Sequence, residues 1–158
     1  MASEGFAIAM FREDGLWRAE PLPPSVVNSL DVLLSALRSQ PPEGGPFIVA
    51  DVDEEFFLIV RLDGARISML LSDLTAAADY PLAAQALERL GEDPPEDDEL
   101  DEACPAGDLD ILSDLGLPES ELELLLEDDT LYPDELLEDV MGRIDLGDQF
   151  VQALRRAR

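Results

Sequence analysis

The chain has 158 residues, of which 46% are hydrophobic, and its 37 acidic and 10 basic residues give a formal charge of −27. This length suits one domain, or a core with a smaller appendage, and the hydrophobic content is too high for a wholly disordered acidic protein. The negative charge opposes phosphate backbones and argues against direct binding of nucleic acid.

The composition also excludes several kinds of catalytic site. The sequence has no histidine, and all its basic residues are arginines. It therefore lacks Ser-His-Asp and Cys-His sites, His-ligated metal centres and lysine-dependent nucleotide sites. The single cysteine, Cys104, permits no internal disulfide and no multi-cysteine metal site. With no basic leader and no apolar run of about 20 residues, this pattern predicts a cytoplasmic protein without a cofactor and without a membrane partner.

The N-terminal part of the chain predicts a β-hairpin followed by a helix. Residues 5–12 and 16–22 have the pattern of strands on either side of a Glu13-Asp14-Gly15 turn. Leucines then recur at helical spacing up to Arg38, after a helix start at Ser25 or Asn28.

The most apolar stretch, residues 54–73, predicts a second hairpin at the centre of the sheet. Residues 47–52 form an expected third strand, and residues 56–62 and 66–71 flank an Asp63-Gly64 turn. Because apolar side chains fall on both faces of 56–62, we expect a central pair of strands with helices covering one side.

A helix over residues 81–90 completes the first part of the chain, with Pro81 in its first turn and Gly91 at its end. The resulting order, β-β-α-β-β-β-α with hairpin connections, predicts an α+β fold. We expect an antiparallel sheet of about five strands with helices on one face, followed by a small, acidic, all-helical C-terminal region.

Residues 91–103 mark the expected domain boundary. They include eight acids, no bases and two prolines, which favours an extended, solvated linker. The sequence therefore predicts a core domain over 1–90 and a helical region over 104–158. Leucine spacing in that region predicts three or four short helices, within 108–115, 119–128, 134–143 and 146–156.

The acids are unevenly distributed along the chain. Residues 91–148 contain 23 acids and one base, Arg143. Charges segregated in this way attract a basic protein surface and orient its approach. The expected partner-binding residues lie in the linker: Glu96, Asp97, Asp98, Glu99, Asp101 and Glu102.

Carboxylate motifs that would suggest an enzyme are weak. With 37 acids, acid pairs at helical spacing arise by chance. The run from Asp51 to Glu55 resembles the start of a calcium loop, but Phe56 stands where glycine is required, and Leu62 where the bidentate glutamate is required. The sequence therefore yields no catalytic and no metal-binding residue.

Several motifs, read together, resemble a known family. They are F-A-I-A-M-F-R-E-D-G-L-W-R (6–18), L-L-S-D-L-T-A-A-A-D-Y-P-L-A (70–83), P-P-E-D-D-E-L-D (94–101), P-A-G-D-L-D-I-L-S-D-L-G-L (105–117) and Y-P-D-E-L-L (132–137). In this order they are similar to the tRNA adenosine deaminase-associated proteins of high-GC Gram-positive bacteria.

The resemblance implies a link to a tRNA adenosine deaminase but carries over no site residue, because the family's name comes from neighbouring genes. The deaminase itself needs zinc ligands that one cysteine and no histidine cannot supply. We therefore expect a non-enzymatic accessory protein that binds a basic partner, with the deaminase as the candidate. Two alternatives stay open: an enzyme that uses carboxylates, alone or with a divalent ion, and a regulatory domain unrelated to tRNA.

Overall fold

The computed structural model describes residues 5–92, 104–128 and 130–157. The described residues form a six-stranded antiparallel sheet in the order β2-β1-β3-β4-β5-β6. The strands are β1 (Gly5–Glu13), β2 (Leu16–Pro21), β3 (Phe47–Val52), β4 (Phe56–Asp63), β5 (Arg66–Leu71) and β6 (Ala106–Gly107). The predicted α+β class is confirmed, and β6 adds a short sixth strand to the five that were expected.

The first hairpin turn has positive φ angles, whereas the second is shifted by one residue from the predicted Asp63-Gly64 pair, because Asp63 still belongs to β4. Asp14 and Gly15 have φ angles of 54° and 79°, as a type I′ turn requires. In the central hairpin Asp63 pairs with Arg66, so the turn residues are Gly64 and Ala65, and Gly64 has a φ of 62°. Glycine at this first position fits a type II′ turn.

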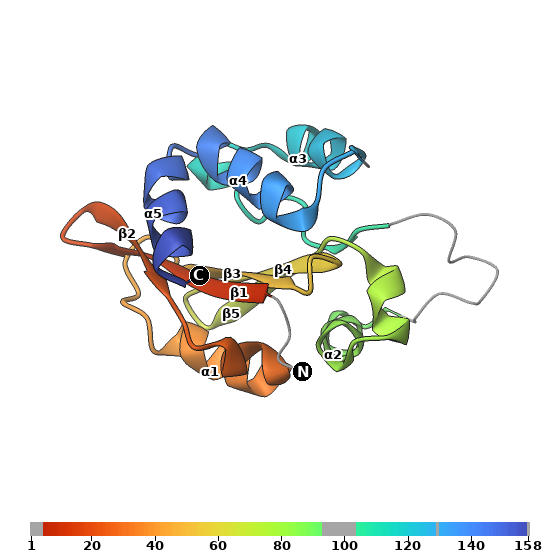
Figure 1. Ribbon diagram of the computed structural model, residues 1–158. Coiled ribbons are helices and arrows are strands. Elements are labelled where there is room, and N and C mark those ends of the chain that lie inside the picture. The colour runs from red at the N-terminus through yellow and green to blue at the C-terminus, as the bar shows by residue number, and fades with distance from the viewer. Residues whose placement is uncertain (1–4, 93–103, 129, 158) are drawn as a thin grey trace.

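Helices α1 (Leu30–Arg38) and α2 (Pro81–Leu90) cover one face of the sheet, below it in Figure 1. Their leucines pack with alternate residues of β1, β3 and β4 in one hydrophobic cluster. The N-cap of α1 is Ser29, whose hydroxyl accepts the Val32 N–H at 3.2 Å, rather than Ser25 or Asn28. Those two residues lie in a 3₁₀ turn, η1 (Pro24–Asn28), that precedes the helix.

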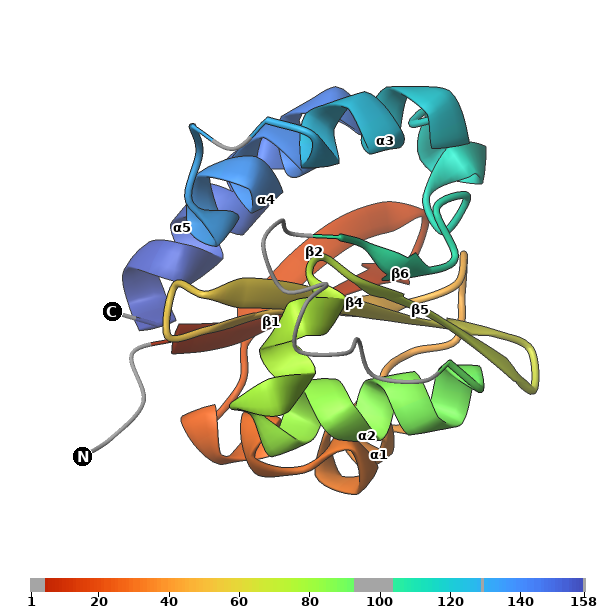
Figure 2. The ribbon, with the colours of Figure 1, turned by 90° about the vertical axis from the view of Figure 1, so that its right-hand side faces the viewer.

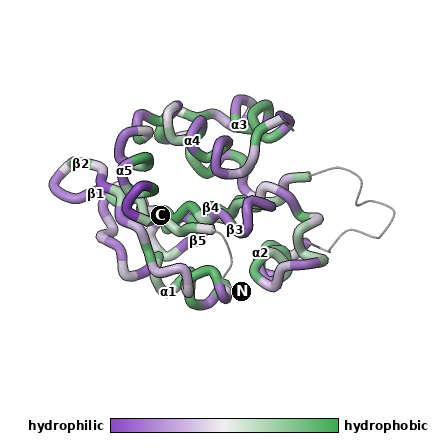
Figure 3. The backbone as a smooth tube through the Cα atoms, in the orientation of Figure 1, coloured by the Kyte–Doolittle hydropathy of each residue, from purple (hydrophilic) through white to green (hydrophobic). Residues whose placement is uncertain are grey.

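The opposite face is covered by the C-terminal helices α3 (Glu119–Leu126), α4 (Pro133–Arg143) and α5 (Gly147–Ala157). Figure 2 shows the sheet between the two helical layers, and Figure 3 shows hydrophobic residues along the strands. Phe57 and Ile59 pack with residues of α4 and α5 in a second cluster, in which Phe150 contacts Phe6 at a centroid distance of 5.9 Å. The C-terminal helices are thus part of a three-layer structure.

The helix predicted for residues 108–115 is wrong. This segment consists of turns and one 3₁₀ turn, η4 (Ser113–Leu115). Asp108 lies beside β5 instead, where its N–H donates to the Met69 carbonyl at 2.8 Å and its carboxylate accepts the Met69 N–H at 3.1 Å. The carboxylate is thus not available to cap a helix at Asp108, and the backbone bonds that follow, such as Ile111 N–H to the Asp108 carbonyl at 3.1 Å, close turns of i to i+3 instead.

No helix in the described ranges is long and apolar enough to cross a membrane. Residues 93–103, most of the predicted linker, lie outside the described residues. The division into domains over 1–90 and 104–158 therefore stays a prediction.

The second cluster contains side chains from the sheet and from the C-terminal helices. Shortening one side chain on each side tests whether the two parts unfold together. We expect Phe57→Ala and Phe150→Ala, both at fully buried positions, each to lower the free energy of unfolding by about 3–5 kcal/mol. Urea denaturation followed by circular dichroism and by Trp17 fluorescence measures both changes.

The exposed substitution Glu123→Ala is the control and should change stability by less than about 0.5 kcal/mol. Two separate transitions in the wild-type protein would instead favour independent domains.

Candidate functional site

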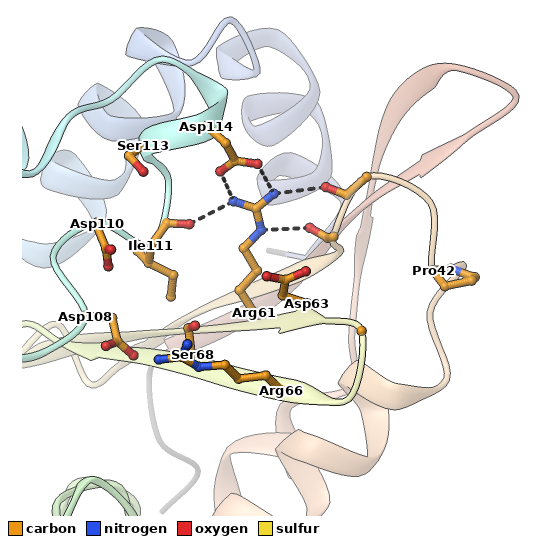
Figure 4. A pocket seen from close by; sticks show the side chains of 13 residues that line it. Pro42, Arg61, Asp63, Arg66, Ser68, Asp108, Asp110, Ile111, Ser113 and Asp114 are labelled. Carbon is orange, nitrogen blue, oxygen red and sulfur yellow. Dashed lines mark hydrogen bonds and ion pairs between the residues drawn. The ribbon is translucent and has the colours of Figure 1, made fainter.

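A polar pocket of about 670 Å³ lies at the end of the sheet nearest the β4–β5 turn (Figure 4). Three segments far apart in sequence form it: the loop before β3, the β4–β5 hairpin and the turns after β6. Its lining comprises Pro42, Gly44, Gly45, Arg61, Asp63, Gly64, Arg66, Ser68, Asp108, Asp110, Ile111, Ser113 and Asp114.

Arg61 joins these three segments. Its side chain, on the same face of β4 as Phe57 and Ile59, is 8% exposed. Nε donates to the Gly45 carbonyl at 3.0 Å and Nη2 to the Gly44 carbonyl at 2.9 Å. Nη1 donates to the Ile111 carbonyl at 2.8 Å. The two terminal nitrogens also form a bidentate pair with Asp114, at 2.5 and 2.9 Å.

These contacts engage all five N–H groups of the guanidinium. Strand alternation puts Arg61 on the same face of β4 as Phe57 and Ile59, but the sequence gives no partner for it. The partners come from residues 44–45 and 111–114, a combination that no local pattern indicates. Arg61 is therefore a structural residue that has no donor left for a ligand.

The glycines of the loop allow this close approach. Gly44 and Gly45 have φ angles of 74° and 77°. A Cβ on Gly45 would lie 2.9 Å from Nη2 of Arg61. A larger residue would therefore strain the backbone and push the loop away from the guanidinium.

Four aspartates line the pocket, and two of them already serve the fold. Asp114 pairs with Arg61, and Asp108 accepts the Met69 N–H. Asp63 and Asp110 are exposed, as is Arg66 in the same lining. Within the described ranges, no three Asp, Glu, Cys or His side chains are grouped so that they could hold a metal ion.

The second candidate site is the acidic outer surface of α3 and α4. Helix α3 has three glutamates and no basic residue, and α4 has four acids and one arginine. On the opposite face of the sheet, α1 and α2 each balance one acid with one arginine. We call the following side chains the acidic layer: Glu119, Glu121, Glu123, Glu127, Asp128, Asp134, Glu135, Glu138 and Asp139.

Hydrogen bonds within the acidic layer favour the charged forms of Asp128 and Arg143. Hydrogen bonds from the Thr130 hydroxyl at 2.5 Å and the Thr130 N–H at 3.0 Å lower the pKa of Asp128. Arg143 donates to Glu121 and, at 3.2 Å, to Asp139, and these bonds raise its pKa. The one base of α4 is thus already paired with two carboxylates.

The sequence-predicted partner-binding residues lie outside the described residues, so their places in the fold stay open: Glu96, Asp97, Asp98, Glu99, Asp101 and Glu102. Cys104, at the start of the next described range, is exposed. At the C-terminal end of α5, Arg156 donates to the Ala19 carbonyl at 2.8 Å, which ties α5 to β2.

Removal of Arg61 should destabilise the fold more than removal of its ion-pair partner. Arg61→Ala removes every contact of the buried guanidinium, and we expect a loss of about 3–5 kcal/mol in the free energy of unfolding. Asp114 is 63% exposed, and the three carbonyls would still bind Arg61, so Asp114→Ala should cost about 1–3 kcal/mol. Urea denaturation gives this order, with the exposed Asp110→Ala as the matched control; equal midpoints for all three would contradict it.

Comparisons with known proteins agree with the resemblance noted from the sequence. The family model for the Rv3753c-like tRNA adenosine deaminase-associated protein matches residues 5–147. The chain is 41% identical over 154 residues to Protein Rv3753c of Mycobacterium tuberculosis, an alignment that covers 97% of this chain and 89% of that protein. No solved structure has a significant match.

The family match spans both helical layers and the sheet, and the related protein aligns over nearly the whole chain. The chain therefore belongs to the Rv3753c-like tRNA adenosine deaminase-associated protein family.

Proposed function

We propose that this protein is a non-enzymatic accessory protein that binds a basic surface of a tRNA adenosine deaminase. The observation that carries the proposal is the acidic layer over α3 and α4, which has no counterpart on α1 and α2. The family description supports the choice of partner, because it names an association with this class of enzyme.

The charge arrangement fits such a partner physically. An enzyme that acts on tRNA presents a basic surface to the phosphate backbone. A protein of formal charge −27 is attracted to that surface, and clustering its acids on one side orients the approach. Exposed ion pairs add little to stability once formed, so the charges chiefly increase the rate of association.

The pocket beside Arg61 favours a second candidate function, an enzyme that depends on carboxylates. Asp63 and Asp110 are the two lining aspartates whose carboxylates have no hydrogen bond or ion pair with the described residues, so the chemistry would depend on them. Asp63→Asn and Asp110→Asn separate the candidates: an accessory protein binds the deaminase as well with these changes as without them, whereas a carboxylate enzyme loses its activity.

Binding to the deaminase should weaken as salt rises. The Debye length falls from about 10 Å at 0.1 M to about 3 Å at 1 M, so added salt screens exposed charges. Titration of the purified deaminase with this protein, by calorimetry at several salt concentrations, measures the effect. Absence of binding at the lowest ionic strength would remove the deaminase as partner.

Neutralising the linker acids tests their role in steering. Replacement of Glu96, Asp97, Asp98 and Glu99 by Gln or Asn should slow association more than it speeds dissociation. Surface plasmon resonance separates the two rates. The matched control replaces four exposed acids in residues 1–90 by Gln or Asn: Asp31, Glu54, Asp79 and Glu88. These substitutions should slow association less.

The isolated chain should neither deaminate adenosine in tRNA nor bind tRNA tightly. It has no histidine and one cysteine, too few ligands for the zinc site of these deaminases, and its charge repels phosphate. An inosine assay and a filter-binding assay at low salt check the two statements. Tight tRNA binding by the protein alone would overturn the electrostatic argument.

A further inference from the structure

A shallow groove of about 670 Å³ runs along the outer side of α4. It is lined by Leu131, Glu135, Glu138, Asp139, Gly142 and Arg143. Four of these residues have the helical spacing i, i+3, i+4 and i+7, which places them on one stripe of α4. The groove therefore follows the helix for about two turns.

Gly142 leaves one end of the groove open. A Cβ at this position would meet no atom within 4 Å, so close packing does not require glycine. Its φ angle is not positive either. A glycine inside a helix is less favourable than alanine, because its backbone loses more conformational freedom on folding. What glycine provides here is space beside the carboxylates.

The groove is negatively charged, and part of its hydrogen-bonding capacity is unused. Glu138 is exposed and has no hydrogen bond or ion pair with the described residues. Glu135 uses one oxygen to accept the Tyr132 N–H at 3.0 Å, and Asp139 uses one to bind Arg143. Since Arg143 also pairs with Glu121, its charge is already compensated.

Exposed apolar side chains lie beside the acids. Tyr132, at the N-cap of α4, is 62% exposed, and Leu124 on α3 is 68% exposed. Tyr132 precedes the groove residue Glu135 by one turn and is bonded to it. A large exposed aromatic residue is a common anchor at protein interfaces, where acidic residues alone contribute little affinity.

We propose that this groove, together with Tyr132, binds a short segment of the partner protein in which arginine or lysine side chains accompany an apolar one. The cations pair with Glu138 and with the unused oxygens of Glu135 and Asp139. The apolar side chain packs on Leu131 and Tyr132. Charge complementarity selects a basic protein segment over nucleic acid, whose phosphates these carboxylates repel. The identity of the partner rests on the proposed function, but the chemistry of the segment does not.

A substitution that fills the groove without changing the charge tests the assignment. Gly142→Leu places a side chain in the open end, and Leu is a better helix former than Gly, so the variant should fold with at least wild-type stability. Gln152→Leu, at an exposed position on α5, adds a leucine outside the groove and is the matched control. Tyr132→Ala removes the aromatic contact at another exposed position.

The probe is a twelve-residue peptide of leucine and arginine at helical spacing, used beside the purified deaminase. Fluorescence anisotropy gives the dissociation constant, and amide chemical shifts locate the bound peptide. We expect Gly142→Leu and Tyr132→Ala each to weaken peptide binding by about tenfold, and Gln152→Leu by less than about twofold. The largest shift changes in the wild-type protein should fall at Leu131, Glu138 and Gly142.

The outcomes separate the two proposals. If the peptide does not bind, or binds Gly142→Leu and Gln152→Leu equally well, the groove is not the site. If the peptide binds in the groove but the deaminase does not bind the protein, the groove stands and the proposed partner falls. If the deaminase binds all three variants as it binds the wild type, the groove assignment fails while the proposed function stands.

Discussion

The buried guanidinium of Arg61 is the interaction on which the arrangement of the two halves of the chain depends. A charged group at this depth is strongly destabilising unless it is paired and its donors are satisfied. Here three carbonyls and one carboxylate take all five N–H groups. Because the acceptors lie in the 44–45 loop and in residues 111–114, the same contacts fix the chain that leads to α3 against the sheet.

The charge asymmetry of the molecule follows from how the C-terminal helices pack. The leucines of α4 and the apolar residues of α5 bury themselves against the second face of the sheet, which turns the acids of α3 and α4 outward. Carboxylates that remain in water keep their hydration, so this surface does not require buried partners. The layer formed by α1 and α2 has a similar amphipathic pattern but balanced charges. A partner that recognises charge can therefore distinguish the side formed by α3 and α4 from the side formed by α1 and α2.

The two candidate sites differ in what the fold leaves available. In the pocket, every N–H donor of the Arg61 guanidinium is bonded within the fold, and Asp108 and Asp114 already accept hydrogen bonds from the protein. On α4, by contrast, Glu138 and the open space at Gly142 have no structural use among the described residues. Asp63 and Asp110 in the pocket are also unused, but the groove on α4 has an exposed aromatic residue beside its carboxylates, so we place the proposed partner contact on the helical surface.

The sequence by itself determined the strands of the first half and the helix over 81–90, because alternation, Asp-Gly turns, Pro81 and Gly91 act through the local backbone. It also placed apolar residues on both faces of β4, yet it could not say what would cover the second face. Only the tertiary structure decided that α4 and α5 do so, and that residues 108–115 are not a helix. In that segment the Asp108 N–H and carboxylate bond to β5, and the Ile111 carbonyl bonds to Arg61. Leucine spacing could not reveal these partners, because they lie about 40 to 50 residues away in sequence and come together only when the chain folds.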